Sequence, residues 1–551
     1  MEIRKIKLEI KTISSMEKVF AKTEPSCVEK GKSVFRKERL NFQIALKLHE
    51  SDMLGLTTIV PKGELAKFVT IRDEGYVADR VIPDFYTDDY YLAKEPTIFP
   101  DVLKPFTALN IMLLAGKWYP VYVSIDLDDT VKAGKYTVDF DVLDKEKRIV
   151  GTTSYQVELI DEVLPELPLK VTNWMHYDSI CYSHNVEPFT DEFYSVFDSY
   201  LKIYTDIGNN MLLIPLFTPP LDTAVGHERK TAQLIDITVS NGEYSFDFAR
   251  LERFIEFSLS RGIKYLEFSH LFSQWGGKFC PKVMATVDGE YKRIFGWETA
   301  SDSKEYVDFL NAFLPKLVAL VKAKGWKEIS HFHLTDEPNP NDFTYYEKDV
   351  NTVRPHLDGM PIMDAASEIE FYENGWIDHP YCVTNAAGRY LDKEIKDLYV
   401  YYCCGPTNFY HSNRLISMPL QRMRVMGYQL YLNKALGFLH WGFNFYNSWL
   451  SYVQVNPYVD TNSGGYFPGG DGFIVYPTTD GAIYSLRAET QKEMFADYSA
   501  LMLLEKYYGE EFVMNLLKEE GMVRYTTYTR SAVWHTEFRE KINSLVKAKL
   551  N

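Results

Sequence analysis

The middle of this 551-residue chain alternates short apolar stretches with segments of helical periodicity. The stretches have the length of buried strands, and the segments between most of them place apolar residues at helical spacing, as in 193–201 and 307–314. The eight stretches are 169–175, 211–217, 263–268, 329–334, 361–365, 380–384, 398–403 and 437–444. Eight strands alternating with helices predict a (β/α)8 barrel of the TIM type. The fifth to seventh units leave little room for a complete helix each.

Residues 1–165 follow a different pattern, in which short segments alternate apolar and polar residues between Gly, Pro and Asp turns. Examples are 42–48, 119–125 and 136–140. This pattern predicts an N-terminal β-sandwich. The segment 161–168 is acidic and contains two prolines, so we expect a stiff linker there.

The expected fold class is therefore α/β with β, a β-sandwich followed by a barrel. We expect a sandwich domain at 1–165, a catalytic barrel at 166–490, and a helical extension at 491–551 that packs on the barrel. Within that extension, the pattern of 525–529 favours a small strand.

Charge and cysteine content limit the partners and the compartment. The chain has 60 Lys and Arg against 76 Asp and Glu, a net charge of -16, which argues against nucleic-acid binding. No uncharged apolar run approaches ~18 residues, and residues 1–6 lack the apolar core of a signal peptide, so we expect no membrane association. The six cysteines show no C-x-x-C spacing, which favours a reducing, cytoplasmic location.

Two adjacent carboxylates, Asp336 and Glu337, follow the fourth apolar stretch. Barrel enzymes carry their catalytic groups at the carboxyl ends of strands. Neighbouring acids cannot both be buried and ionised without a large free-energy cost, so their environments separate their pKa values and suit one as an acid and one as an anion. The alternative is a solvated turn, because Asp-Glu-Pro is common in turns.

Polar and aromatic residues follow several of the other predicted strands, and they suit a sugar pocket, which needs polar partners for hydroxyls and an aromatic wall for the ring face. These residues are Asn173, Trp174, His176, His270, Asp364, Asn385, Trp441 and Asn444. For Trp174 and Trp441, packing in the core or at the rim of the barrel is the alternative. The aromatic content of 15% suits sugar stacking and aromatic cores alike.

Three further features were weighed as sites. His331 and His333 have the spacing of two metal ligands, but no third ligand follows with a clear spacing, so we expect packed core histidines and no metal or other cofactor. Glu267 ends an apolar stretch and is either a second, nucleophilic carboxylate or a capping or salt-bridging residue. The glycines of 464–472 lack the strand-turn-helix setting of a phosphate loop and predict a tightly turning loop.

Three motifs together carry a family resemblance. They are Thr335-Asp336-Glu337-Pro338, the segment 470–477 that begins Gly470-Asp471-Gly472, and Ser485-Leu486-Arg487-Ala488-Glu489. With the N-terminal β pattern, the chain resembles glycoside hydrolase family 123 over nearly its whole length. Where the family often has an apolar residue after the arginine, this chain has the small Ala488.

The resemblance implies an exo-acting β-N-acetylgalactosaminidase that works by substrate-assisted retention. In that route the 2-acetamido oxygen of the sugar attacks the anomeric carbon and forms an oxazolinium-like intermediate. We assign Glu337 as general acid and Asp336 as the carboxylate that orients the acetamido N–H. Trp441 and Trp174 are expected to form aromatic walls that contact the sugar. Its polar partners are expected among Asn173, His176, His270, Asn444 and Asp471.

Two other interpretations of the function stay open. The first is a non-catalytic glycan-binding protein on a barrel scaffold. The second is a glycosidase of other specificity, such as a β-N-acetylglucosaminidase or an endo-acting enzyme, because one or two pocket contacts decide the configuration at O4. The expected partner is a carbohydrate with terminal β-N-acetylgalactosamine, from an oligosaccharide or a glycolipid, and the oligomeric state is not determined.

Overall fold

The computed structural model describes residues 7–49, 53–80, 87–107 and 111–550. Residues 1–6, whose lack of a signal-peptide pattern was noted above, lie outside the described residues. Among the helices of the described residues, none combines the length and the apolar character needed to cross a bilayer. The chain divides into two compact units, described one at a time: residues 1–167, 408–432 and 483–551 form the first, and residues 168–407 and 433–482 form the second.

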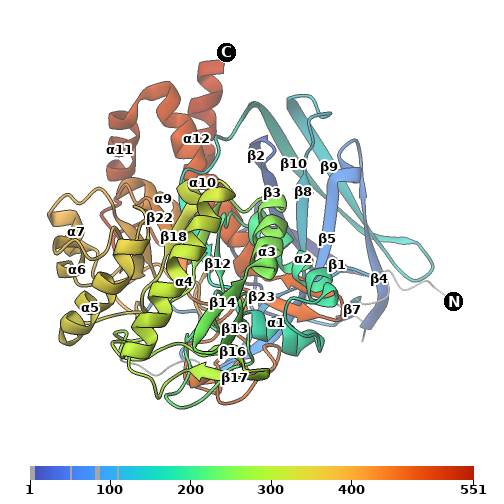
Figure 1. The fold of residues 1–551 in the computed structure, drawn as a ribbon. Coiled ribbons are helices and arrows are strands. Elements are labelled where there is room, and N and C mark those ends of the chain that lie inside the picture. The colour runs from blue at the N-terminus through green and yellow to red at the C-terminus, as the bar shows by residue number, and fades with distance from the viewer. Residues whose placement is uncertain (1–6, 50–52, 81–86, 108–110, 551) are drawn as a thin grey trace. The chain divides into compact units, whose positions relative to one another are not determined.

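The first unit contains two five-stranded sheets, drawn in blue to cyan in Figure 1. One sheet has the order β1-β3-β8-β5-β6 and is antiparallel; the other has the order β2-β10-β9-β4-β7, in which β2 pairs with β10 in parallel. The strands are β1 (Leu8–Ser14), β2 (Gly31–Arg36), β3 (Arg39–Leu48), β4 (Met53–Lys62), β5 (Val69–Asp79), β6 (Thr97–Pro105), β7 (Ile111–Leu114), β8 (Trp118–Asp126), β9 (Gly134–Leu143) and β10 (Ile149–Val163).

Side chains from both sheets share one hydrophobic core. Phe42, Ile44 and Leu46 alternate along β3 and so share one face of the strand, and all three are buried in the same cluster as Phe140 and Tyr155 of the other sheet. The ring of Phe42 stacks on that of Tyr155 with centroids 3.8 Å apart. The strand β10 continues to Val163, so the first part of the expected linker at 161–168 is strand.

The helices of the first unit come from the later parts of the chain. They are α8 (Leu420–Arg424), α9 (Met426–Leu432), α10 (Leu486–Tyr508), α11 (Glu510–Glu519) and α12 (Ala532–Leu550), with a 3-10 turn at Ala66–Phe68. The expected extension at 491–551 therefore groups with the sheets of the N-terminal region. A buried ion pair joins this extension to the N-terminal region, because Arg539 contacts Glu38 at 2.7 Å, and Arg487, at the start of α10, contacts Asp101 at 2.9 Å.

The strand expected at 525–529 is not present as such. The structure has only an isolated bridge between Val523 and Thr527 in this part of the described chain. The hairpin β23 (Val475–Thr478) and β24 (Gly481–Tyr484) precedes α10, which begins where the hydroxyl of Ser485 accepts a hydrogen bond from the N–H of Ala488.

The second unit contains one strand in each of the eight predicted apolar stretches. They form two parallel sheets, with the orders β11-β22-β21-β20-β19 and β12-β15-β18. The strands are β11 (Lys170–Asn173), β12 (Met211–Ile214), β15 (Tyr265–Phe268), β18 (Ser330–Phe332), β19 (Met363–Ala365), β20 (His379–Val383), β21 (Tyr399–Tyr401) and β22 (Gly437–His440). Backbone hydrogen bonds from Phe332 to Pro361 and from Asn210 to Val171, both 3.0 Å, join the two half-barrel sheets.

Helices follow most of these strands, as the periodicity predicts. They are α1 (Tyr177–His184), α2 (Asp191–Asp206), α3 (Ala249–Ser260), α4 (Lys304–Ala323), α5 (Phe343–Val353), α6 (Glu370–Glu373) and α7 (Gly388–Asp392), with 3-10 turns at Lys327–Ile329, Pro340–Asp342, Arg354–His356 and Trp449–Ser451. In α2, Phe193, Phe197 and Leu201 recur at helical spacing and are buried on one face. The short α6 and α7 match the little room that the sequence leaves in this region.

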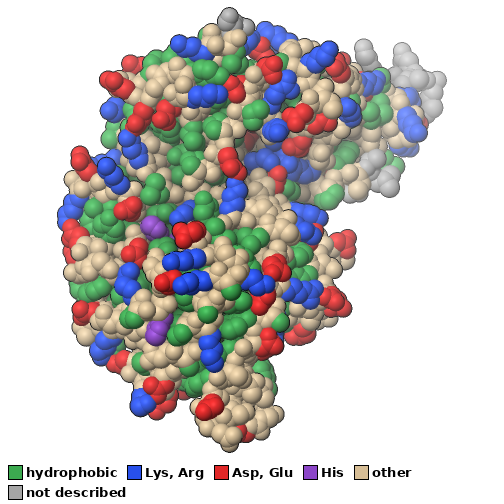
Figure 2. Space-filling model, turned by 45° about the horizontal axis from the view of Figure 1, so that its top comes forward, with side chains coloured by type: hydrophobic (Ala, Val, Ile, Leu, Met, Phe, Trp, Pro, Cys, Tyr) green, Lys and Arg blue, Asp and Glu red, His purple; other side chains and the backbone are tan. Residues whose placement is uncertain are grey.

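An additional sheet decorates the second unit. It has the order β14-β13-β16-β17 and consists of β13 (Asp236–Ser240), β14 (Glu243–Asp247), β16 (Val283–Val287) and β17 (Glu290–Phe295). Figure 2 shows one face of the molecule, on which acidic and basic side chains are both present and interspersed.

Candidate active site

The fourth strand of the second unit is shorter than its apolar stretch, and the Asp336–Glu337 pair lies on the loop beyond it. β18 ends at Phe332, yet the chain stays aligned with the segment after β15, because the N–H of Phe272 donates to the carbonyl of Leu334 at 2.9 Å. The N–H of Trp275 donates to the carbonyl of Asp336 at 2.8 Å. These backbone bonds fix the pair at the carboxyl end of the strands.

The backbone at Glu337 is in the left-handed region, with φ of 42°. A non-glycine residue there costs about 1 kcal/mol or more, and such conformations cluster at functional sites. Trp275, whose N–H bonds to the residue before Glu337, also has a positive φ of 58°. The two loops that meet here are therefore both held in strained conformations.

A cavity of about 230 Å³ opens above the pair. Asp336, Glu337, Trp174 and Trp441, which the sequence singled out, all line it. The other lining residues are Leu221, Asp222, Gln274, Trp275, Ala365, Tyr401, Cys403, Cys404, Leu439, Trp449, Tyr466 and Phe467. Indole and phenol rings thus surround three carboxylates.

The two carboxylates of the pair are both hard to ionise in this pocket. Burial raises the pKa of Asp336 well above its usual range, and the neighbouring Glu337 adds to this increase. Burial also raises the pKa of Glu337, whereas a 2.6 Å hydrogen bond from the hydroxyl of Tyr401 stabilises its ionised form and lowers it. At neutral pH, burial in the pocket therefore favours a pair that retains a proton.

Asp222 is a third carboxylate in the pocket, which sequence reasoning did not single out. It lies on the loop after β12 and accepts a hydrogen bond of 3.0 Å from the N–H of Leu450. Burial raises its pKa to about 6. Its charge also acts on Asp336, so the two carboxylates lie within electrostatic range.

A buried charge cluster underlies the pair. His333 bonds through Nδ1 to Asp364 at 2.9 Å and through Nε2 to Glu267, and all three side chains are fully buried. Burial opposes the charged imidazole, but the two carboxylates outweigh it and raise the pKa of His333 to about 9. Glu267 is thus the salt-bridging residue that was one of its two expected roles.

This cluster anchors one pocket wall and the loop that carries Asp336 and Glu337. Asp364 accepts a hydrogen bond of 3.0 Å from the N–H of Leu334 and one of 2.6 Å from the hydroxyl of Tyr346. Glu267 accepts a hydrogen bond of 2.7 Å from the indole N–H of Trp174. The cluster therefore ties the backbone just before Asp336 to an aromatic side chain of the pocket.

The donor atoms of His270, His333 and Asp364 lie within 4.8 Å of one another and form the one group of the described residues whose geometry suits a metal ion. Both nitrogens of His333 are engaged with Glu267 and Asp364. A metal ion would have to break one of these bonds and displace a proton from a group with a raised pKa. The geometry fits a hydrogen-bonded ion pair better than a set of metal ligands.

Five residues expected to contact the sugar lie behind the pocket wall and do not line the cavity. The side-chain amide of Asn444 bonds to the backbone of His176: its oxygen accepts from the N–H of His176 at 2.8 Å, and its NH2 group donates to the carbonyl of His176 at 3.1 Å. His176 Nε2 donates to the carbonyl of Trp441 at 2.9 Å. Asp471 accepts a hydrogen bond of 2.9 Å from the indole N–H of Trp441. These contacts hold Trp441 in place.

The remaining two residues of this group are buried below the other wall. Asn173 donates to Asn209 at 2.6 Å, and His270 stacks on His333 with ring centroids 4.5 Å apart. Burial lowers the pKa of His270 well below its usual value, with a further contribution from the charge of His333. The imidazole of His270 is therefore neutral.

Sequence reasoning missed pocket residues that come from inside a strand or from long loops. Tyr401 lies within β21, where alternation with Tyr399 was the available signal. Trp449 and Tyr466 lie on the loop after β22, and their rings stack with centroids 4.0 Å apart. The folded course of this loop brings both residues to the pocket, and no local sequence pattern indicates it.

The fold and this carboxylate-lined aromatic pocket are those of a carbohydrate-active enzyme. The family model described as the glycoside hydrolase 123 catalytic domain matches residues 174–504, which is more than half of the chain. The protein belongs to glycoside hydrolase family 123. It is therefore a glycoside hydrolase.

One solved structure agrees with this at the level of the fold. A family 123 glycoside hydrolase from Clostridium perfringens, described for glycolipid glycan hydrolysis, matches with a TM-score of 0.75 at 15% identity over 98% of this chain and 99% of that chain. A family 20 exo-β-N-acetylglucosaminidase from Vibrio harveyi has a TM-score of only 0.27 at 9% identity, over 95% of this chain and 99% of that chain. No curated protein matches the chain.

Proposed function

We propose that this enzyme releases terminal β-linked N-acetylgalactosamine by a retaining, substrate-assisted mechanism. The observation that carries the proposal is the position of Asp336 and Glu337, sequence neighbours that both line one aromatic pocket. Ordinary retaining glycosidases place two carboxyls roughly 5 to 5.5 Å apart on opposite sides of the anomeric carbon, an arrangement that neighbouring residues cannot easily make. The nucleophile is then the 2-acetamido oxygen of the sugar.

In this mechanism Glu337 protonates the departing glycosidic oxygen and later accepts a proton from water. Its raised pKa keeps it protonated for the first step. Asp336 acts as an anion that orients the acetamido N–H and offsets the positive charge of the oxazolinium-like intermediate. The empty pocket also raises the pKa of Asp336, and an N–H donor from the bound sugar lowers it again, because a hydrogen bond to the carboxylate favours the ionised form.

In this proposal the rings of Trp174 and Trp441 contact the sugar, and Gln274 offers it a hydrogen-bond acceptor. The Oε1 atom of Gln274 is buried at the pocket and has no hydrogen-bond partner among the described residues. Asn173, His176, His270, Asn444 and Asp471 then contribute by holding the walls, as their contacts favour. A hydroxyl or amide N–H of the substrate satisfies the free acceptor of Gln274.

Asp222 supports one competing mechanism, a double displacement in which it attacks the anomeric carbon while Glu337 acts as acid. Its place in the pocket favours this alternative, since it supplies the second carboxylate that the sequence did not reveal. The two mechanisms differ in the substrate they require. Substrate assistance needs the 2-acetamido group, whereas double displacement tolerates a 2-hydroxyl.

We also propose that the eight parallel strands of the second unit form the ring of a (β/α)8 barrel, and that the two sheets of the first unit form a β-sandwich. The hydrogen bonds at both junctions of the parallel sheets and the shared core of the other two support these assignments. Cys403 and Cys404 line the pocket and form no disulfide, which suits a reducing, cytoplasmic compartment. The Clostridium perfringens structure suggests a glycolipid glycan as one natural substrate.

The decisive experiment compares p-nitrophenyl β-N-acetylgalactosaminide with p-nitrophenyl β-galactoside and p-nitrophenyl β-N-acetylglucosaminide. We expect turnover of the first and a loss of at least ~10³-fold in kcat/KM on the second, because the internal nucleophile is missing. Comparable cleavage of the galactoside rules out substrate assistance and favours Asp222 as nucleophile. Faster cleavage of the glucosaminide reassigns the sugar specificity.

A further inference from the structure

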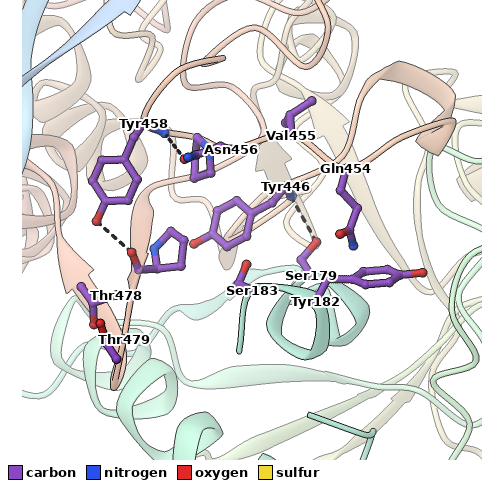
Figure 3. Close-up of a pocket in the computed structure, with 12 residues that line it drawn as sticks. Ser179, Tyr182, Ser183, Tyr446, Gln454, Val455, Asn456, Tyr458, Thr478 and Thr479 are labelled. Carbon is purple, nitrogen blue, oxygen red and sulfur yellow. Dashed lines mark hydrogen bonds between the residues drawn. The ribbon is translucent and has the colours of Figure 1, made fainter. Parts of the chain in front are cut away.

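A second and larger cavity, of about 600 Å³, lies in the second unit and shares no lining residue with the pocket of Asp336 (Figure 3). It is formed by the end of α1, the loop 446–458 and the end of β23. None of its 12 lining residues is Asp, Glu, Lys, Arg or His, although Asp, Glu, Lys and Arg make up 25% of the chain. A charged ligand therefore finds no ionic partner in its lining.

Three tyrosines line this cavity, and two of them are accessible. Tyr182 is 45% exposed and Tyr458 is half-buried, whereas Tyr446 is only 2% exposed, and Figure 3 shows its ring between those of Tyr458 and Tyr182. The hydroxyls of Tyr446 and Tyr458 donate to backbone carbonyls at 2.9 and 2.8 Å, which fixes both rings. The accessible aromatic surface therefore comes from Tyr182 and Tyr458. Aromatic faces of this kind stack on the apolar faces of sugar rings with little loss of side-chain entropy.

Polar side chains with unused hydrogen-bonding capacity line the same cavity. Ser183 on α1, Gln454 on the loop and Thr479 after β23 make no side-chain hydrogen bond within the described part of the chain. They come from three separate elements and offer hydroxyl and amide groups to one space. Such groups match the alternating donors and acceptors of sugar hydroxyls.

We propose that this cavity is a second binding site for a neutral saccharide unit, distinct from the catalytic pocket. Aromatic faces, neutral hydroxyls and an amide recognise an uncharged polyol and disfavour both ions and purely apolar ligands. The site binds an internal part of an extended glycan and so raises the local concentration of its terminal sugar at the enzyme. Substrates too small to reach this site gain no affinity from it.

One loop connects the two sites. Gln454 pairs with Asn447, and the N–H of Ser448 donates to the carbonyl of Val453 at 2.8 Å, so residues 447–454 form a closed turn. Trp449, inside this turn, lines the catalytic pocket. A saccharide that contacts Gln454 therefore binds the same turn that carries part of the catalytic pocket.

The test uses Tyr182→Ala and Gln454→Ala, with Tyr291→Ala on β17 as the matched control, because Tyr291 is 62% exposed and lies outside both cavities. Lactose is the binding probe, followed by saturation-transfer NMR, since it lacks the 2-acetamido group. We expect the two cavity variants to weaken lactose binding by about fivefold or more, and the control to leave it unchanged. Lactose binding should persist in Trp441→Ala, which perturbs the catalytic pocket alone.

Kinetics provide the second measurement. With the trisaccharide GalNAcβ1-4Galβ1-4Glc we expect KM to rise about three- to tenfold in the cavity variants, with kcat unchanged and with unaltered kcat/KM on the p-nitrophenyl sugar. Lactose binding that equals that of Tyr291→Ala in both cavity variants overturns the proposal, as does loss of binding in Trp441→Ala alone. If Tyr182→Ala does not fold, the result for Gln454→Ala decides the test, because Gln454 is exposed. The lactose result is independent of the sugar specificity proposed above.

Discussion

Tyr401 donates a 2.6 Å hydrogen bond from its hydroxyl to Oε1 of Glu337. This bond stabilises the ionised carboxylate in a pocket whose burial otherwise favours the neutral acid. In the proposed mechanism Glu337 is the general acid, which must lose and regain its proton within one catalytic cycle, so the balance of these two effects determines the pH range in which it can work.

Removing this hydroxyl shifts the pH profile. In Tyr401→Phe the pKa of Glu337 rises, because the charged form loses its donor, so the protonated acid persists to higher pH. We expect the alkaline limb of kcat/KM to move upward by roughly half a unit to one unit and kcat to fall by ~10-fold. Tyr399→Phe, on the same strand but without a bond to Glu337, serves as control. A downward shift contradicts the assignment.

Neutralising Glu337 and neutralising Asp336 should reduce activity in different ways. Glu337→Gln removes the proton donor, so substrates with poor leaving groups suffer most and activated aryl glycosides keep more of their rate. Asp336→Asn removes the anion that stabilises the intermediate, so every substrate slows by ~10²-fold or more. Rates across a series of substituted phenyl leaving groups test this. The opposite pattern reverses the roles, and losses below ~10-fold for both place the site elsewhere.

His333 makes stability depend on pH. Its pKa of about 9 in the folded state exceeds the ordinary 6.5, so its contribution is fully present below about pH 6.5 and disappears as pH rises through 9. We expect the free energy of unfolding to fall by about 3 kcal/mol over this range from this group alone. Urea unfolding at several pH values measures it.

Two variants isolate the contribution of this histidine. His333→Gln should remove this pH dependence and destabilise the fold by about 3 to 5 kcal/mol, because Glu267 and Asp364 lose their buried partner. His331→Gln is the control, since burial lowers the pKa of His331 to about 3 and leaves it neutral over the same range. An unchanged slope in His333→Gln means that the imidazole is neutral in the native protein.

Chelation should leave turnover unchanged. Both nitrogens of His333 are occupied by carboxylates, and a proton from Glu337 suffices to activate the glycosidic oxygen. The measurement is activity after dialysis against EDTA and after return of Zn²⁺ or Mg²⁺. Loss of activity that one of these ions restores would instead identify His270, His333 and Asp364 as metal ligands.

Truncating Trp441 tests the aromatic wall. Trp441→Ala removes the indole that Asp471 fixes by a 2.9 Å hydrogen bond. We expect KM to rise about tenfold for every accepted sugar, because stacking on the ring face is lost in ground state and transition state alike. Trp297→Ala, outside the pocket, controls for loss of an aromatic residue. If Trp441→Ala changes kcat alone, Trp441 does not act by stacking on the sugar but positions other groups of the pocket.

The sequence by itself determined the features that depend on local periodicity and on order along the chain. Each of the eight apolar stretches contains a strand, because a buried parallel strand needs a continuous apolar run. The position of Asp336 and Glu337 after the fourth strand predicted that they face the site, since loops at the carboxyl ends of parallel strands converge.

Tertiary structure alone decided which side chains share the pocket and which lie behind it. His176 and Asn444 follow strands as expected, and Asp471 lies on the loop before β23. Their side chains hold Trp441 directly, or through His176 in the case of Asn444, because buried polar groups must find hydrogen-bond partners. Asp222 and Trp449 reach the pocket from long loops, whose course depends on contacts between residues far apart in sequence. Local patterns carry no signal for such contacts, so only the folded chain places these two residues beside Asp336 and Glu337.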